Sequence, residues 1–437
     1  MTNNAIFWLK TDLRLHDNET LVKALETSNQ LILVYCFDER HYKEQSLGFK
    51  KTGYFKTKFI MESLKDLQAS LESLGAGLTV VYGKTEEEIV RLAMAFSVKN
   101  VYSQKEIAPE EVALEKLVGK ELYKIDCVLH CFPAGSLYAD EDLPFSIMDT
   151  PDQFTNYRVK VEKSAVVKPS FPVPDFAASV ISTKFELPTF EDLGIPILLE
   201  DPRSAFPFTG GEQQAIARLN SYFFESHHIA RYKETRNEMI GTEFSTKFSA
   251  WLAVGCISPQ YIYEKVKEYE TRFGANESTY WITFELLWRD YFRLMIQKHY
   301  VKFFQKNGIK KKAGLTRAFN EKAIMTWIDG ETPAELVNAA MKELKLTGYI
   351  SNRARQIVAS YLCNDLMVDW RYGAAYFEAQ LIDYDVCSNW ANWAYVAGVG
   401  NDPRGNRYFN VDKQAEVYDP EGKYRRLWLN KDLTNNF

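Results

Sequence analysis

Short apolar runs alternate with helix-length segments over the first third of the chain, and this alternation constrains the fold most strongly. Four runs rich in β-branched and aromatic residues lie at 6–9, 31–37, 79–82 and 100–103. Helix-length segments at 52–74 and 85–96 lie between them. Strands separated by helices form parallel sheets through βαβ units. The sequence therefore predicts a doubly wound α/β domain over residues 1–131.

The pattern changes twice more along the chain. Residues 132–207 are punctuated by proline, which cannot continue a helix or an interior strand, so we interpret them as an interdomain connector. After Gly210 and Gly211, apolar residues recur at spacings of three and four, which is typical of helices. The predicted helices lie at 212–226, 259–272, 279–300, 333–345, 351–365 and 372–382. The sequence thus predicts an all-α domain over residues 208–437.

Composition excludes several classes of protein. The 437 residues are 46% hydrophobic and 25% charged, as in globular domains. No apolar run approaches the ~20 residues of a membrane span, and the first residues do not resemble a secretion signal. We therefore expect a cytoplasmic monomer that does not bind membranes. The net charge of −5 leaves room for one basic face.

The six cysteines are scattered and form no CxxC pair, which is typical of buried thiols. Cys127 and Cys131 could ligate a metal, but structural zinc sites need four ligands and no second half-site follows. We expect no metal.

Three segments of the predicted helical domain combine charged residues with tryptophan. They lie at 351–356, 365–371 and 383–395. Charged side chains are costly to bury without partners. The segments therefore predict either a structural network of ion pairs, joining Arg353 and Arg355 to Asp383 and Asp385, or a binding site.

These segments resemble the flavin pocket of the photolyase/cryptochrome family. Residues 8–18 resemble the family's opening strand and loop, 241–249 its flavin diphosphate-binding turn, and 284–292 its substrate-pocket helix. The resemblance covers nearly the whole chain in the family's order. It implies an antenna-binding first domain and a helical second domain that binds FAD and a DNA lesion.

The resemblance implies how the chain binds FAD. Asn389 would face N5 of the isoalloxazine ring, Asp383 would pair with Arg355 beside it, and Asp385 would lie near its polar edge. Such neighbours tune the charge that a reduced ring holds. The residues implied to bind FAD are Tyr232, Ser245, Thr246, Lys247, Phe248, Ser249, Glu285, Arg289, Asn352, Arg355, Asp383, Asp385 and Asn389.

Hydroxyl groups ahead of a helix predicted to begin near Ala250 offer a cradle for the diphosphate. They belong to Ser245, Thr246 and Ser249. A helix N-terminus and convergent hydroxyls bind phosphate groups. An ordinary N-cap explains the same residues equally well.

The resemblance also implies a lesion site, because cleavage of a cyclobutane dimer requires the damaged bases to leave the helix. The residues implied to be catalytic are Glu285, Trp288, Asn352 and Asn389. The residues implied to contact DNA are Trp288, Arg289, Arg353, Gln356, Tyr395 and Arg404. The alternative is that Trp288 is a core tryptophan with Glu285 beside it on the helix.

A cluster of lysines is a candidate for neutralising DNA phosphates. It comprises Lys298, Lys302, Lys306, Lys310, Lys311 and Lys312, and Arg404, Arg407, Arg425 and Arg426 could extend it. A solvated lysine-rich loop explains the cluster equally well.

At two positions the chain differs from many double-strand photolyases and resembles the cryptochrome-DASH subfamily. Tyr395 stands where many double-strand photolyases have tryptophan, and Gln356 where they have methionine; residues 398–410 also resemble this subfamily. Six-four photolyases use two cavity histidines, whereas this chain has Ser351 and Asn352 there. Histidine acid–base chemistry is therefore not expected in the cavity.

Trp393 and Trp370 match the proximal and middle residues of the family's electron-transfer chain. The distal position holds Arg317, so Trp390, Trp327 or a tyrosine would have to replace it, unless these tryptophans are only core aromatics. The subfamily's antenna is methenyltetrahydrofolate. Glu106 could contact it, although a solvated carboxylate at a helix entry is an equal explanation.

We therefore expect a light-driven deoxyribodipyrimidine photo-lyase that acts on cyclobutane pyrimidine dimers, preferentially in single-stranded DNA. The alternative is a blue-light photoreceptor that binds DNA or protein without net repair. Glu285, Trp288 and Asn352 favour repair, and so does the lack of a long tail before Phe437. A light-independent flavin oxidoreductase is disfavoured, because the glycine fingerprint of a dinucleotide fold is missing.

Overall fold

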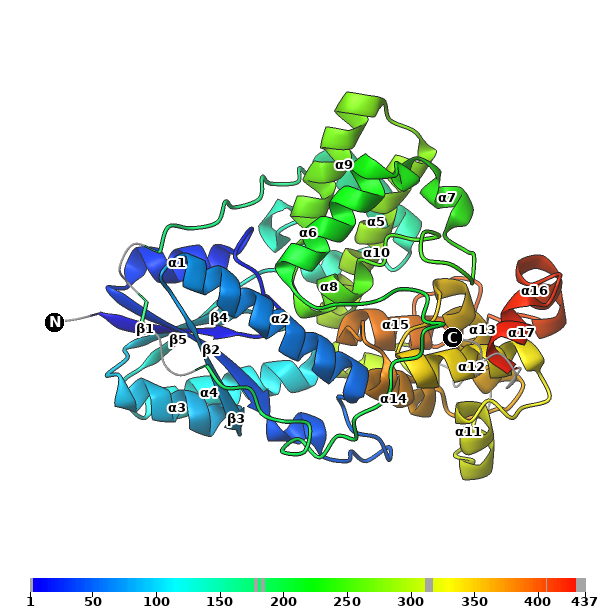
Figure 1. The fold of residues 1–437 in the computed structure, drawn as a ribbon, viewed down its shortest axis with the longest axis horizontal. Helices are drawn as coiled ribbons and strands as arrows, with labels where there is room; N and C mark the ends of the chain where they lie inside the picture. Colours follow the sequence, from blue (N-terminus) through cyan, green and yellow to red (C-terminus); the bar gives the residue numbers. More distant parts are fainter. Residues whose placement is uncertain (1–2, 177–179, 182–184, 311–316, 406, 430–437) are drawn as a thin grey trace.

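A computed structural model describes residues 3–176, 180–181, 185–310, 317–405 and 407–429. An α/β domain and a helical domain lie side by side in Figure 1. This arrangement confirms the predicted fold class, while the domain boundaries themselves stay predictions. No helix among these residues is long and apolar enough to cross a membrane.

The described residues of the first domain form one five-stranded parallel sheet with the order β3-β2-β1-β4-β5. The strands are β1 (Asn4–Leu9), β2 (Gln30–Asp38), β3 (Leu78–Gly83), β4 (Asn100–Gln104) and β5 (Val128–Phe132). The first four match the predicted strands. The fifth was missed because it is an edge strand whose residues are only partly buried, so it carries no long apolar run.

Helices cover both faces of this sheet (Figure 1). They are α1 (Glu19–Thr27), α2 (Tyr54–Ser73), α3 (Thr85–Ala95) and α4 (Pro109–Tyr123). Successive side chains of a strand point to opposite faces. Phe7 and Leu33 therefore pack with α1 and α2, whereas Ile6 and Ile32 pack with α3 and α4. Both faces of the central strands are buried, as parallel sheets require.

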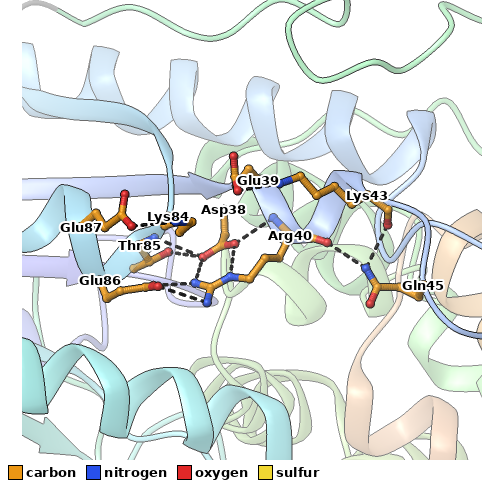
Figure 2. Close-up of polar contacts among 9 residues, drawn as sticks. All are labelled: Asp38, Glu39, Arg40, Lys43, Gln45, Lys84, Thr85, Glu86 and Glu87. Atoms are coloured by element: carbon orange, nitrogen blue, oxygen red, sulfur yellow. Dashed lines mark hydrogen bonds and ion pairs between the residues drawn. The ribbon is translucent and has the colours of Figure 1, made fainter.

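Asp38 ties the carboxyl end of β2 to the start of α3 (Figure 2). Its carboxylate accepts hydrogen bonds from the Arg40 guanidinium at 2.7 and 2.6 Å and from the Thr85 hydroxyl at 2.7 Å. Glu86 holds the same guanidinium at 2.7 Å. Burial alone would raise the pKa of Asp38, but these hydrogen bonds outweigh it and lower the pKa.

The second domain is helical throughout its described regular structure. Its helices are α6 (Glu212–Asn220), α7 (Tyr232–Thr235), α8 (Ser249–Val254), α9 (Pro259–Phe273), α10 (Glu277–His299), α11 (Glu321–Ile328), α12 (Glu335–Thr347), α13 (Asn352–Asn364), α14 (Trp370–Gln380), α15 (Val386–Val396), α16 (Val411–Tyr418) and α17 (Lys423–Leu429). Helices match all six predicted segments, with ends that differ by a few residues.

The described residues of the proline-rich connector, where no regular structure was predicted, form one α-helix and two short 3-10 helices (Asp140–Asp142 and Ile147–Asp149). The α-helix is α5 (Phe154–Ser164), and its buried residues Phe154, Tyr157 and Val161 recur at helical spacing. It packs against α10 beside the remaining helices of the second domain (Figure 1). The surrounding prolines obscured this short pattern in the sequence.

The loop after β1 binds the helical domain through hydrogen bonds. Leu13 N–H donates to the Val254 carbonyl at 3.2 Å, and the Arg14 guanidinium donates to the Gly255 carbonyl at 2.9 Å. The buried Glu212 carboxylate accepts the Leu15 N–H at 2.7 Å and also contacts the His16 ring. This polar loop at the sheet edge is therefore buried by interdomain contacts.

Gly255 lies at the tightest point of this interface. It ends α8 with φ +76°, and a Cβ there would collide with the Thr11 carbonyl and lie 2.6 Å from the Asp12 Cα. We expect Gly255→Ala to lower the free energy of unfolding by about 1–3 kcal/mol more than Gly274→Ala does. Gly274 also has a positive φ (+93°), but nothing lies within 4 Å of its Cβ position.

Urea unfolding of both variants measures this difference, and equal losses would contradict a tight interface at Gly255.

Asp290 of α10 links the helical domain to the connector. Its Oδ2 accepts the N–H groups of Leu137 at 2.8 Å and Tyr138 at 3.2 Å, and its buried Oδ1 has no hydrogen-bond partner among the described residues. Burial raises the pKa of Asp290 to about 6, although Arg289 and the two N–H groups oppose it.

The folded protein therefore binds the Asp290 proton more tightly than the unfolded chain, where the ordinary pKa is 3.8. Stability from this group is full below about pH 4 and falls by about 3 kcal/mol as the pH rises to about 6. We expect Asp290→Asn to remove that decline. The difference in unfolding free energy between variant and wild type, measured from pH 4 to 7, checks it, and a pH-independent difference would contradict it.

Candidate active site

A cavity of about 440 Å³ lies within the helical domain, between α8, α10, α13 and α15. Cavities of this size hold small-molecule ligands. The sequence-predicted site residues that line it are Tyr232, Ser245, Thr246, Lys247, Phe248, Ser249, Glu285, Trp288, Arg289, Asn352, Arg355, Gln356, Asp383, Asp385, Asn389, Trp393 and Tyr395. Residues from five separate stretches of sequence therefore meet at one place.

An ion pair forms part of the cavity wall. The Arg355 guanidinium on α13 donates to the Asp383 Oδ2 at 2.8 Å and to the Ile350 carbonyl at 3.0 Å. Burial would lower the pKa of Arg355, but Asp383 outweighs it and raises the pKa. The other oxygen of Asp383 is buried and accepts no hydrogen bond from the described residues. A ligand in the cavity could supply that missing donor.

The N-terminus of α15 places Asp385 and Asn389 on the same wall. Asp385 caps the helix by accepting the Ser388 N–H at 2.7 Å, and it faces Arg289 at 3.8 Å. Burial would raise the pKa of Asp385, but Arg289, Arg293 and Ser388 lower it, so the carboxylate stays charged at neutral pH. The amide of Asn389 donates to the Ala374 carbonyl at 3.0 Å, which fixes its orientation.

Aromatic rings form another part of the wall. Trp288 stacks on Phe154 of α5, with ring centroids 3.7 Å apart and planes 9° apart. Tyr395 meets the Trp288 edge at 5.9 Å, and the Arg407 guanidinium lies over the Tyr395 ring at 4.9 Å. The helix within the connector thus supports the ring most suited to stack on a base.

Glu285 pairs with Arg236 at 2.6 Å between these two walls. Burial raises the pKa of Glu285, and Arg236 opposes this rise. Sequence reasoning missed Arg236, although it lies four residues after Tyr232 and could share its helical face. It also missed Tyr349 and Phe377, and it named Arg407 only as a possible phosphate contact. Phe244, Tyr384, Ser388 and Asn392 lie within the predicted flavin segments, although no role was predicted for them individually.

Three of the predicted residues do not line the cavity. Arg353 donates to the Asn237 side chain at 3.1 Å and lies over the Tyr418 ring at 4.6 Å. Arg404 is exposed beside Asp402. Trp370 donates to the Lys306 carbonyl at 3.0 Å.

The tryptophans form two ring contacts behind the cavity. Trp393 lies 6.1 Å from Trp327, and Trp370 lies 5.8 Å from Trp390, measured between ring centroids. Arg317 is buried where a distal tryptophan would stand, and it donates to the Cys363 and Ala397 carbonyls. The electron-transfer roles of Trp393 and Trp370 stay predictions.

The lysine cluster is partly engaged by protein. Lys298 binds Asp152 at 2.7 Å, and Lys310 donates to the Asp402 carbonyl at 3.4 Å. Lys311 and Lys312 lie outside the described residues.

Glu106, the residue predicted to contact a folate antenna, lies in the α/β domain and pairs with Lys10 at 3.3 Å. The folate antenna stays a prediction.

The donors and acceptors of the cavity fit FAD. Lys247 lines it, and the buried Nζ of this lysine has no hydrogen-bond partner among the described residues, as the Asp383 Oδ1 has none. Burial lowers the pKa of Lys247 well below its usual range. A diphosphate and a ring with a polar edge would supply partners for both groups, and the flanking Phe248, Leu252 and Phe377 offer apolar surface.

Comparison with known proteins agrees with this geometry. Residues 5–175 match the family model described as DNA photolyase, and residues 281–434 match the FAD binding domain of DNA photolyase. The second match confirms FAD as the cofactor.

Relatives that match over nearly the whole of this chain identify the subfamily. Cryptochrome DASH of Synechocystis sp. is 43% identical over 97% of this chain and 87% of its own length. Cryptochrome DASH of Danio rerio is 46% identical over 98% of this chain and 83% of its own length. The crystal structure of the Synechocystis sp. cryptochrome superimposes with a TM-score of 0.93 at 42% identity, and the match covers 100% of this chain and 90% of that one. The chain therefore belongs to the photolyase/cryptochrome family, within its cryptochrome DASH subfamily.

Proposed function

We propose that this protein repairs cyclobutane pyrimidine dimers by light-driven electron transfer, preferentially in single-stranded DNA. The proposal rests on one observation: a polar wall and an aromatic wall line the same cavity. Polar residues suited to FAD, including Arg355, Asp383 and Asn389, share it with the aromatic rings of Trp288 and Tyr395. Reduced FAD held by these polar residues would supply light-driven transfer of an electron that returns after the dimer splits, so the reaction would consume no net reductant.

In this proposal the chain's own residues admit and orient the lesion. Trp288 and Tyr395 stack on the extruded bases, as aromatic rings do in single-strand-binding proteins. Glu285 and Asn352 hydrogen-bond to base edges from the same cavity. Arg353 and Arg404, which lie outside the cavity lining, would contact the DNA backbone and not the lesion.

The preference for single strands follows from the cost of extrusion. A base must leave its stack before it can enter a cavity of this kind, and that cost is least where the strand is already open. The competing function is light sensing without net repair. The relatives are named cryptochromes, which is consistent with this alternative.

Illumination of the reduced holoprotein with a dimer-containing oligonucleotide should restore thymine faster in the single strand than in the duplex. Trp288→Ala should weaken binding of this DNA about 5- to 150-fold, because one stacked base is worth about 1–3 kcal/mol. Trp288→Phe keeps an aromatic face and should retain most of the affinity.

Restored thymine is measured by chromatography, and affinity by fluorescence anisotropy. Repair of neither strand form would favour the photoreceptor function. Equal affinities of the alanine and phenylalanine variants would remove Trp288 from the lesion site.

We propose Asp383 and Arg355 as neighbours of the flavin ring, and their charges should then set its reduction potential. Asp383→Asn removes a negative charge but keeps an acceptor for Arg355. We expect the potential to rise, by about 30 mV for each 1.4 kcal/mol of lost repulsion in a two-electron couple.

Redox titration followed by flavin absorbance measures this shift. Glu378→Gln is the control, because Glu378 is also a buried carboxylate, bonded to the Trp390 ring nitrogen at 3.2 Å, but does not line the cavity. Equal shifts in the two variants would argue against a flavin beside Asp383.

A further inference from the structure

The loop at residues 242–248, between α7 and α8, borders the cavity without regular structure of its own. We call it the cavity loop. It lines the cavity through Phe244, Ser245, Thr246, Lys247 and Phe248, and Lys247 has a left-handed backbone with φ +64°. Phe248, which follows, is right-handed with φ −63° and ψ −17°. Consecutive residues of opposite hand turn their N–H groups into a concave surface that binds anions.

One guanidinium holds this loop from behind. Arg218 of α6 is 6% exposed and does not line the cavity. Its Nε donates to the Thr246 carbonyl at 3.1 Å, and its Nη2 donates to the Ser245 carbonyl at 3.1 Å and the Thr242 carbonyl at 3.4 Å. Its Nη1 donates to Glu243 at 2.9 Å. Every hydrogen bond that the Arg218 guanidinium donates to the described residues ends on the cavity loop.

Two aromatic rings fix the plane of this guanidinium. The Arg218 carbon Cζ lies 4.8 Å from the Phe206 ring centroid and 4.9 Å from that of Tyr222. Rings on its faces leave only the edges of the planar fork free to donate. Phe206 of the connector and Tyr222 of the π-helical turn after α6 (Ser221–Glu225) therefore set the direction of its hydrogen bonds.

We propose that Arg218 is a positioning residue that shapes the cavity loop to receive the diphosphate of FAD. By drawing three carbonyl oxygens toward itself, Arg218 keeps their negative ends from facing an anion in the cavity. Because the Glu243 carboxylate at 2.9 Å balances the charge of the guanidinium, Arg218 acts on the loop through its hydrogen bonds. This inference rests on the cavity residues proposed as the flavin site, and it is independent of DNA repair.

The test compares FAD with a ligand that lacks both the diphosphate and the adenosine that it carries. Holoprotein is stripped of flavin and titrated with FAD or with riboflavin, which has the same ring but no phosphate. Arg218→Lys keeps the charge and loses the fork, and Arg218→Gln loses both. We expect each variant to weaken FAD binding at least about tenfold and riboflavin binding less than about twofold.

Arg203→Lys is the matched control. The Arg203 side chain is also largely shielded, at 9% exposed, and it lies over the Trp428 ring at 4.5 Å and donates to the Leu427 carbonyl at 3.0 Å, but it does not contact the cavity loop. The control should bind both ligands as the wild type does. Equal losses for FAD and riboflavin in Arg218→Lys, or no loss for either, would overturn the proposal.

Hydrogen exchange on flavin-free wild type keeps the proposal testable if neither Arg218 variant folds. Adding FAD should protect the amides of the cavity loop and adding riboflavin should not, and equal protection by both ligands, or by neither, would overturn it. Failure of the wild type to bind FAD would instead remove the flavin site itself.

Discussion

Charged groups that are buried around one cavity must find partners, and this constraint organises the helical domain. Arg355 and Asp383 satisfy each other across 2.8 Å, Asp385 is held by the N-terminus of α15, and Glu285 is held by Arg236. Each pairing leaves part of its polar surface toward the cavity. Removing one partner of a buried pair leaves an uncompensated charge, which is more costly than never burying the pair. The wall is therefore rigid, and a rigid polar wall suits a cofactor whose charge changes.

The α/β domain and the connector contribute to this cavity indirectly. The loop after β1 binds the end of α8, whose first residue, Ser249, lines the cavity. The connector supplies Phe154 behind Trp288 and Phe206 beside Arg218. Segments far from the cavity in sequence thus support its aromatic wall and the cavity loop. Interdomain packing and ligand binding are physically linked in this chain.

The chain belongs to the photolyase/cryptochrome family and binds FAD, and light-driven electron transfer is the chemistry that we propose for it. What distinguishes repair from sensing is the fate of that electron, which depends on whether a lesion reaches the flavin. The adjacency of the polar and aromatic walls is the feature that favours repair. The same cavity without a bound lesion would serve a photoreceptor. Measured repair of dimers in DNA therefore distinguishes the two functions.

The sequence predicts much of this architecture. Alternating apolar runs determined a parallel α/β domain, periods of three and four determined the helices, and short motifs brought together most cavity residues by resemblance. These signals are local, or belong to a family pattern. Tertiary structure alone decided that α5 backs Trp288, that Arg236 faces Glu285 and that Arg218 holds the cavity loop. Such contacts join residues separated by 24 to 134 positions, and no local pattern specifies which buried charge or ring will meet another. They follow only when the whole chain has packed and every buried donor has found its acceptor.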